Sequence, residues 1–234
     1  MTDSHDIKDS SKQQCSCSDS SVYFSEMAER SAKGVAWQQA LQRLKDGNRR
    51  YVNKSSHNNS SCEYTRQLLC KGQWPYATVL CCSDSRVSPE IVFDAGLGDL
   101  FIVRVAGNII DSRLLGSIEY ATLHSTSKLI VVMGHGSCGA VTAATHAVSN
   151  PDVTDTPGIN GIVSDLMPAV LKAKKHTGLE GCELIEAAAR ENVRMSCNLI
   201  RETSEPLADM ENAGDIKIIG AYKHLTSDEV EFFD

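Results

Sequence analysis

Two short motifs, each at the end of an apolar run, constrain this chain more than any other feature of its sequence. The first is Cys82-x-Asp84-x-Arg86, and the second is His135-x-x-Cys138. Two thiolates and one imidazole suit Zn²⁺, and three protein ligands leave the fourth tetrahedral position for water. The motifs therefore predict a catalytic zinc site with Cys82, His135 and Cys138 as ligands.

Apolar, β-branched runs alternate with helical patterns along the chain. The runs lie at 78–82, 100–103, 129–133 and 216–221, and they predict strands buried on both faces. Such alternation predicts an α/β fold with a mostly parallel central sheet flanked by helices. The two motifs are expected at the carboxyl edge of the sheet, where open α/β folds place their ligands. Helices are expected from Trp37 to a stop at Gly47 and Asn48, after an N-cap at Ser88, and over 111–124, 140–148 and 184–200.

Cys81 and Cys82 compete for the role of ligand. Side chains alternate along a strand, so Cys82, Asp84 and Arg86 share one side and Cys81 points to the other. This alternation favours Cys82, provided that the extended backbone continues through Asp84. Cys138 is expected at a helix N-terminus, where free N–H groups favour a thiolate.

Asp84 and Arg86 are expected to assist the metal. Zinc with two thiolates and a neutral imidazole has no net charge, so it polarises water less than an all-imidazole site would. Asp84 is placed to accept a hydrogen bond from that water, and Arg86 to hold Asp84 through a bidentate pair. A simple ion pair is the alternative. A released Asp84 would reach the metal and displace the water, and this hypothesis predicts lower activity at lower pH.

Composition limits the classes of function. The chain has 234 residues, enough for one sizeable core, and a formal net charge of -7, so the basic surface of a nucleic-acid binder is not expected. No apolar run approaches the roughly 20 residues of a membrane-spanning helix, and no export signal is evident, so we expect a cytoplasmic protein without a membrane or nucleic-acid partner. The nine cysteines are odd in number and are expected to be reduced.

The polar, serine-rich start of the chain cannot bury enough apolar surface to offset its ordering entropy. We therefore expect residues 1–34 to form a disordered N-terminal arm and residues 35–234 to form a single zinc domain. Cys15 and Cys17 lie in this arm without nearby partners, so exposed thiols are favoured over a second metal site.

The two motifs, read at full length, resemble the signatures of β-class carbonic anhydrases. They are Cys82-Ser83-Asp84-Ser85-Arg86-Val87 and Gly134-His135-Gly136-Ser137-Cys138-Gly139-Ala140. Further segments match that family in order over about residues 37 to 234, namely Gly47-Asn48-Arg49-Arg50-Tyr51, Gly72-Gln73-Trp74-Pro75, Phe101-Ile102-Val103-Arg104, Ala106-Gly107-Asn108, Gly116-Ser117-Ile118-Glu119-Tyr120-Ala121 and Ile219-Gly220-Ala221-Tyr222.

The resemblance implies reversible hydration of CO₂ to bicarbonate and a proton by a zinc-bound hydroxide, with one Zn²⁺ per chain. It implies Cys82, His135 and Cys138 as ligands and Asp84 with Arg86 as the orienting pair. Gln73 matches a glutamine whose amide donates to a substrate oxygen. Val87, Phe101 and Tyr120 match apolar residues of the family's substrate pocket. Gly139 matches a backbone N–H donor in the same pocket.

The resemblance also implies a homodimer or a dimer of dimers, with the N-terminal helix crossing onto the partner and the pocket formed at the interface. The implied sheet has four parallel strands and an antiparallel edge strand, which residues 229–233 would supply. Val79 stands where bicarbonate-regulated members carry Trp, so that regulatory site is not expected. Other departures from the family pattern are Ser88, Val105 and the segment 222–227.

Two alternative functions remain. Hydrolysis of COS or CS₂ would use the same zinc chemistry but would call for a narrow apolar tunnel. A non-catalytic zinc sensor or scaffold would not need Asp84, Arg86 and Gln73. No histidine is assigned as a proton shuttle, and His124, His146 and His224 are candidates by residue type alone.

Overall fold

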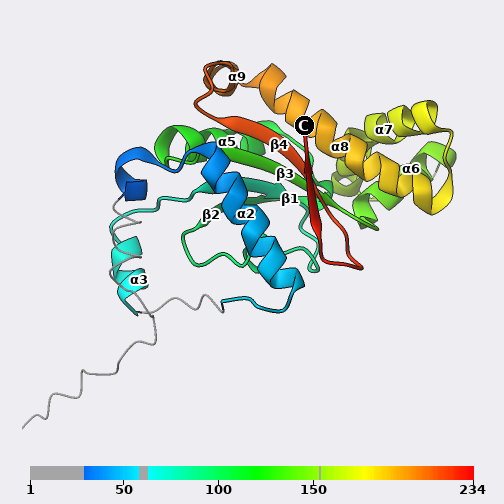
Figure 1. Cartoon of the computed structure of the whole chain (residues 1–234). Helices are drawn as coiled ribbons and strands as arrows, with labels where there is room; N and C mark the ends of the chain where they lie inside the picture. Colours follow the sequence, from blue (N-terminus) through cyan, green and yellow to red (C-terminus); the bar gives the residue numbers. More distant parts are fainter. Residues whose placement is uncertain (1–28, 58–62, 153) are drawn as a thin grey trace, which may run out of the picture.

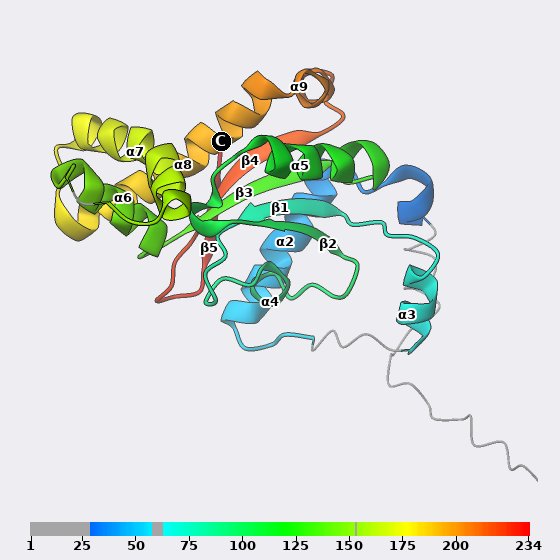
Figure 2. The same cartoon turned by 180° about the vertical axis from the view of Figure 1, so that it is seen from behind.

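The computed structural model of the chain describes residues 29–57, 63–152 and 154–234, and its centre is a five-stranded sheet (Figures 1 and 2). The strand order is β2-β1-β3-β4-β5. The first four strands are parallel, and β5 runs antiparallel to β4 at one edge, as predicted. The strands are β1 (Ala77–Cys81), β2 (Leu100–Arg104), β3 (Leu129–His135), β4 (Lys217–Lys223) and β5 (Val230–Phe233).

Helices cover both faces of the sheet and extend beyond one end. Helices α2 and α4 pack on one face, whereas α5, α8 and α9 pack on the other. Helices α6 and α7 join α8 in a lobe at the carboxyl ends of the strands, at the opposite end from α3 (Figures 1 and 2). The helices are α2 (Trp37–Val52), α3 (Glu63–Leu69), α4 (Pro89–Val92), the 3₁₀ turn η1 (Ala106–Asn108), α5 (Ser112–His124), α6 (Gly139–Ser149), α7 (Pro157–Thr177), α8 (Gly181–Thr203) and α9 (Glu205–Asn212).

The alternation of side chains along β1 separates the two neighbouring cysteines. Val79 and Cys81 are buried against α2, whereas Leu80 faces α5 and α8 on the opposite side of the sheet. Each such buried aliphatic side chain contributes roughly 1.5–3 kcal/mol. Cys82 continues the phase of Leu80 and lies in the cluster formed with the helical lobe. The predicted separation of Cys81 from Cys82 is therefore confirmed.

The predicted end of the first helix at Gly47 and Asn48 is wrong. Helix α2 continues through both residues to Val52. Gly47 is needed for close packing rather than for a stop, because a Cβ atom there would overlap the carbonyl oxygen of Phe93. The side chain of Asn48 donates to Val92 O at 3.2 Å and accepts from Val230 N at 2.9 Å, so it joins α2 to α4 and to β5.

The other helix predictions agree with the structure, with one difference in capping. The Asp111 side chain caps α5 by accepting from the N–H groups of Arg113 and Leu114. Ser88 occupies the N-cap position of α4, but its hydroxyl donates to Glu90 Oε2 at 3.2 Å and caps no N–H group. Helices α6 and α8 each extend slightly beyond the predicted residues.

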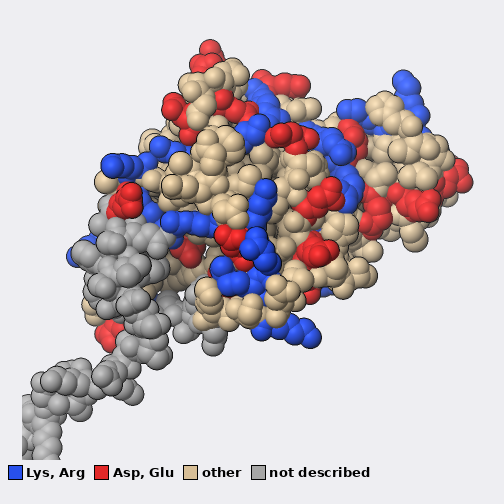
Figure 3. Space-filling model, in the orientation of Figure 1, with Lys and Arg blue, Asp and Glu red and all other residues tan. Residues whose placement is uncertain are grey.

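The described part of the chain contains no helix that is both long and apolar enough to cross a membrane. Lys, Arg, Asp and Glu are interspersed over the face drawn in Figure 3. The expected N-terminal arm lies largely outside the described residues, since the structure describes it only from residue 29, where a helical turn runs to residue 33. The boundary at residue 34 stays a prediction.

Candidate metal centre

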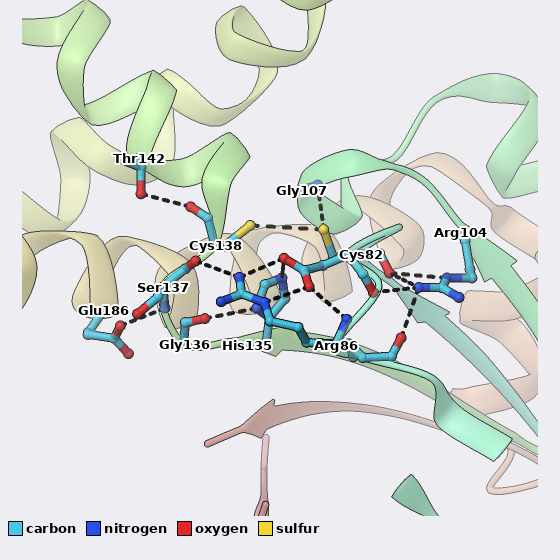
Figure 4. Close-up of polar contacts among 12 residues, drawn as sticks. Cys82, Arg86, Arg104, Gly107, His135, Gly136, Ser137, Cys138, Thr142 and Glu186 are labelled. Carbon is cyan, nitrogen blue, oxygen red and sulfur yellow. Dashed lines mark hydrogen bonds and ion pairs between the residues drawn. The ribbon is translucent and has the colours of Figure 1, made fainter. Parts of the chain in front are cut away.

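Cys82, His135 and Cys138 converge at the carboxyl edge of the sheet. Cys82 follows β1, His135 ends β3, and Cys138 precedes α6 (Figure 4). Their potential ligand atoms all lie within 4.8 Å of one another, and the three side chains are buried. The two sulfur atoms are 4.0 Å apart, close to the roughly 3.8 Å that a tetrahedral zinc with Zn–S bonds of about 2.3 Å requires.

His135 is held in one orientation by its own loop. Its Nδ1 lies 2.9 Å from the carbonyl oxygen of Gly136, so Nδ1 carries the proton and donates it to that oxygen. The other ring nitrogen, Nε2, is buried and has no hydrogen-bond partner among the described residues. Because a buried unpaired nitrogen costs free energy, a metal ion at this position would supply the partner that Nε2 lacks. The residues therefore fit a zinc ion.

A hydrogen bond, in which one proton is shared, joins the two sulfur atoms. The hydrogen bonds from Cys138 and from the Gly107 N–H, the latter at 3.3 Å, lower the pKa of Cys82 to about 4 despite burial. The same hydrogen bond, together with burial, raises the pKa of Cys138, although the N–H groups of Ala140 and Val141 act in the opposite direction. The predicted position of Cys138 at the start of α6 is confirmed, and the N–H groups there favour its thiolate. A bound dication would take the place of the shared proton.

Asp84 and Arg86 form a bidentate pair beside the three ligands. Arg86 Nε donates to Asp84 Oδ1 at 2.9 Å, and Nη2 donates to Oδ2 at 2.8 Å. These hydrogen bonds hold the pKa of Asp84 well below its usual range. Asp84 Oδ2 is 4.0 Å from His135 Nε2, so the carboxylate lies at the edge of the ligand cluster. Arg86 Nη2 also donates to Ser137 O at 3.2 Å, which joins the two motif loops.

Two residues that no local sequence pattern singles out, Arg104 and Glu186, hold these loops by hydrogen bonds. Arg104, at the end of β2, donates to the carbonyl oxygens of Cys82, Asp84 and Val87 (Figure 4). Glu186, on α8, accepts from the Ser137 N–H at 2.8 Å. Arg104 belongs to a segment that matches the family, but the residues around it in the sequence do not indicate which carbonyl oxygens it binds. Glu186 is 49 residues from Ser137, and its helical pattern carries no signal of this contact.

Gln73 is not brought to the ligand cluster within one chain. It is exposed and precedes β1, whereas Cys82 follows β1, so the two residues lie at opposite ends of the same strand. A five-residue strand spans roughly 17 Å. A single chain therefore does not join Gln73 to the three ligands.

The four predicted pocket residues have different environments. Val87 is fully buried in the core against α2 and α4. Phe101 on β2 and Tyr120 on α5 form a tilted aromatic pair with ring centroids 6.3 Å apart, and Tyr120 is 51% exposed. Gly139 starts α6, and a Cβ atom there would meet open space. Only Gly139 adjoins a ligand, because it directly follows Cys138.

Comparisons with known proteins agree with this fold and site. The family model described as carbonic anhydrase matches residues 77–230. The chain is 38% identical over 189 residues to carbonic anhydrase 2 of Mycobacterium tuberculosis, covering 80% of this chain and 87% of the relative. It is 40% identical over 192 residues to the carbonic anhydrase of Mycolicibacterium smegmatis, with coverage of 82% and 91%. The solved β-carbonic anhydrase CcaA superposes with a TM-score of 0.66 at 28% identity, covering 83% of this chain and 87% of that one.

The chain therefore belongs to the β-class carbonic anhydrase family, as its motifs indicated. It is an enzyme of the carbonate dehydratase type, a lyase.

Proposed function

We propose that this chain catalyses the reversible hydration of CO₂ to bicarbonate and a proton at a zinc ion held by Cys82, His135 and Cys138. The observation that carries the proposal is the unpartnered, buried Nε2 of His135 beside two thiols within bonding range of one ion. When bound, zinc supplies a nucleophile at neutral pH by lowering the pKa of a coordinated water.

Asp84 orients the attacking water by accepting its hydrogen bond, and Arg86 holds Asp84 in place. The support is the bidentate geometry, in which both carboxylate oxygens are engaged by Arg86. With both oxygens held, the carboxylate stays 4.0 Å from His135 Nε2 and outside the ligand set. Gly139 contributes its N–H group close to Cys138.

A second copy of the chain completes the site. Gln73, whose amide would donate to a substrate oxygen, is exposed at the far end of β1. Strand β2 is an edge of the sheet with no neighbouring strand beyond it among the described residues. Large apolar side chains are exposed near it, namely Leu97, Tyr120 and Leu123. An exposed apolar surface of this kind is typical of an interface. We therefore propose a homodimer or a dimer of dimers, in which Val87, Phe101 and Tyr120 contribute the apolar part of a pocket shared between chains.

We also propose a cytoplasmic location. The described residues contain six free cysteines, namely Cys70, Cys81, Cys82, Cys138, Cys182 and Cys197. A reducing compartment keeps such thiols available as zinc ligands.

Stopped-flow measurement of CO₂ hydration tests the function. The assay uses protein of known zinc content from about pH 6.5 to 9, with Cys82→Ser as the control that removes one ligand. Fast turnover that rises with pH and is lost in Cys82→Ser is expected. No turnover at full zinc occupancy, even at the alkaline end, would contradict the proposal. Hydrolysis of COS or CS₂, or a zinc-bearing sensor, would then be the remaining explanations.

A further inference from the structure

A single peptide group lies between Glu186 and the metal ligand His135. The carbonyl of Gly136 and the N–H of Ser137 belong to this peptide group. Its N–H donates to Glu186 Oε1 at 2.8 Å, and its carbonyl oxygen accepts from His135 Nδ1 at 2.9 Å (Figure 4). A carboxylate on α8 is thus connected through one peptide to the imidazole that faces the metal position.

The backbone next to this peptide adopts a conformation that is unfavourable without support from its surroundings. Ser137 adopts a left-handed conformation, with φ at 49°. A residue other than glycine in this region costs on the order of 1 kcal/mol and persists when its surroundings hold it there. Glu186 holds the N–H of Ser137, and Arg86 holds its carbonyl oxygen at 3.2 Å.

The contact between Glu186 and the loop is close as well as polar. A Cβ atom at Gly136 would lie 3.3 Å from both Glu186 Oε2 and the Tyr222 hydroxyl oxygen. On its other side, the N–H of Gly136 donates to Lys223 O at 3.0 Å. The Gly136–Ser137 peptide therefore lies between β4 and α8 with little freedom to rotate.

We propose that Glu186 is a positioning residue for the metal site and that it acts on His135 through the Gly136–Ser137 peptide. The carboxylate polarises the peptide, which makes the Gly136 carbonyl a stronger acceptor for the His135 Nδ1 proton. That proton is thereby kept on Nδ1, and the Nε2 lone pair stays directed at the metal. Carboxylates that orient a metal-bound histidine directly have the same effect on tautomer and basicity. This inference rests on the proposed zinc site.

Zinc affinity in variants of Glu186 tests the inference on the full chain. Glu186→Ala removes the acceptor, whereas Glu186→Gln keeps an acceptor oxygen and removes the charge. The matched control is Glu183→Ala, which removes an exposed carboxylate near the start of the same helix. The zinc dissociation constant is measured by competition with a chromophoric chelator, and folding of each metal-free protein is followed by circular dichroism.

The dissociation constant is expected to rise about 10–100-fold in Glu186→Ala, less in Glu186→Gln, and not in Glu183→Ala. A second readout is the His135 Nδ1–H resonance in zinc-loaded, histidine-labelled protein. Its proton is expected to exchange faster with water in Glu186→Ala, a change that general destabilisation of the fold would not confine to His135.

Zinc affinities within twofold of wild type in both Glu186 variants, with an unchanged Nδ1–H resonance, would overturn the inference and leave the proposed function intact. A wild-type chain that binds no zinc would overturn both.

Discussion

Arg104 donates two hydrogen bonds to the carbonyl oxygen of Cys82, from Nε at 3.2 Å and from Nη2 at 3.1 Å. The same Nη2 lies 2.8 Å from Asp84 O and 2.9 Å from Val87 O. One guanidinium thus holds three carbonyls of the loop that carries Cys82, a proposed metal ligand, and Asp84, the proposed orienting carboxylate. The loop geometry depends on β2 although no proposed metal ligand comes from that strand.

Substitution of Arg104 by lysine should weaken the site while keeping the charge. A lysine ammonium has no planar fork and does not reach the three carbonyls together. We expect Arg104→Lys to reduce the free energy of unfolding by about 1–3 kcal/mol and zinc affinity by about tenfold. Denaturant unfolding and chelator competition measure these effects, with the exposed Arg113→Lys on α5 as control. Equal values for both variants would show that the Arg104 contacts are dispensable.

Substitution of Asp84 by asparagine should separate turnover from zinc binding. Asp84 lies outside the Cys82, His135 and Cys138 group, so Asp84→Asn is expected to retain one zinc per chain. The amide keeps one acceptor but loses the charge and the bidentate pair with Arg86, and we expect turnover to fall about 100-fold. Metal analysis and stopped-flow CO₂ hydration measure the two quantities. The exposed Asp165→Asn on α7 serves as control, and full turnover in Asp84→Asn would exclude the orienting role.

Hybrid dimers test whether Gln73 serves the partner's site. One chain carries Gln73→Ala and the other carries Cys82→Ser, each with its own affinity tag, so that tandem purification isolates the hybrid. If Gln73 acts across the interface, the Gln73→Ala chain keeps its zinc ligands and receives an intact Gln73 from its partner. The hybrid then has one complete site and about half the wild-type turnover. If Gln73 acts within its own chain, neither site is complete and the hybrid is as inactive as Gln73→Ala alone.

Local patterns were sufficient for the strands and for the grouping of Cys82, His135 and Cys138, because both depend on neighbouring residues. The alternation along β1 distinguished Cys82 from Cys81, and the spacing of His135 and Cys138 placed both at one turn. The contacts that hold these ligands could not be predicted in the same way. Arg104 is 22 residues from Cys82, and Glu186 is 49 residues from Ser137. Contacts between residues so far apart in the sequence produce no periodic pattern in it.

The end of α2 shows the same limit. A glycine followed by asparagine usually ends a helix, but here tertiary contacts override that preference. Gly47 makes room for the backbone of Phe93, and Asn48 bonds to Val92 and Val230. The same Gly-Asn pair can end a helix or satisfy a packing requirement inside one, so the sequence alone does not distinguish the two cases.

Substitution of Gly47 by alanine should therefore destabilise the protein although it raises helix propensity. The added methyl group would overlap the Phe93 carbonyl and force α2 away from α4. We expect a loss of about 2 kcal/mol or more in the free energy of unfolding. The matched control is Gly161→Ala in α7, where a Cβ atom meets open space, and this variant should be stabilised by up to about 1 kcal/mol. Urea denaturation of the two variants compares them, and stabilisation by both would contradict the packing role.

The free energy of unfolding should depend on pH through the carboxylate of Glu211, which lies away from the metal centre. Its carboxylate accepts from Arg201 Nε at 2.7 Å and from Ile218 N at 2.9 Å, and these contacts join α8 and α9 to β4. Burial raises the pKa of Glu211, but the hydrogen bonds from Arg201 and Ile218 outweigh it and leave the pKa lowered. A carboxylate with a lowered pKa stabilises the fold above its unfolded pKa of about 4.3, and this stabilisation is lost as the pH falls through the lowered value.

Glu211→Gln should consequently be less stable than wild type by about 1 kcal/mol near neutral pH, because the charged partner of Arg201 is gone. The difference should shrink as the pH falls below about 4, where the wild-type carboxylate also becomes protonated. Urea unfolding at several pH values measures the difference, with the exposed Glu202→Gln as control. A stability difference that is constant with pH would mean that the Glu211 side chain acts through packing and not through its charge.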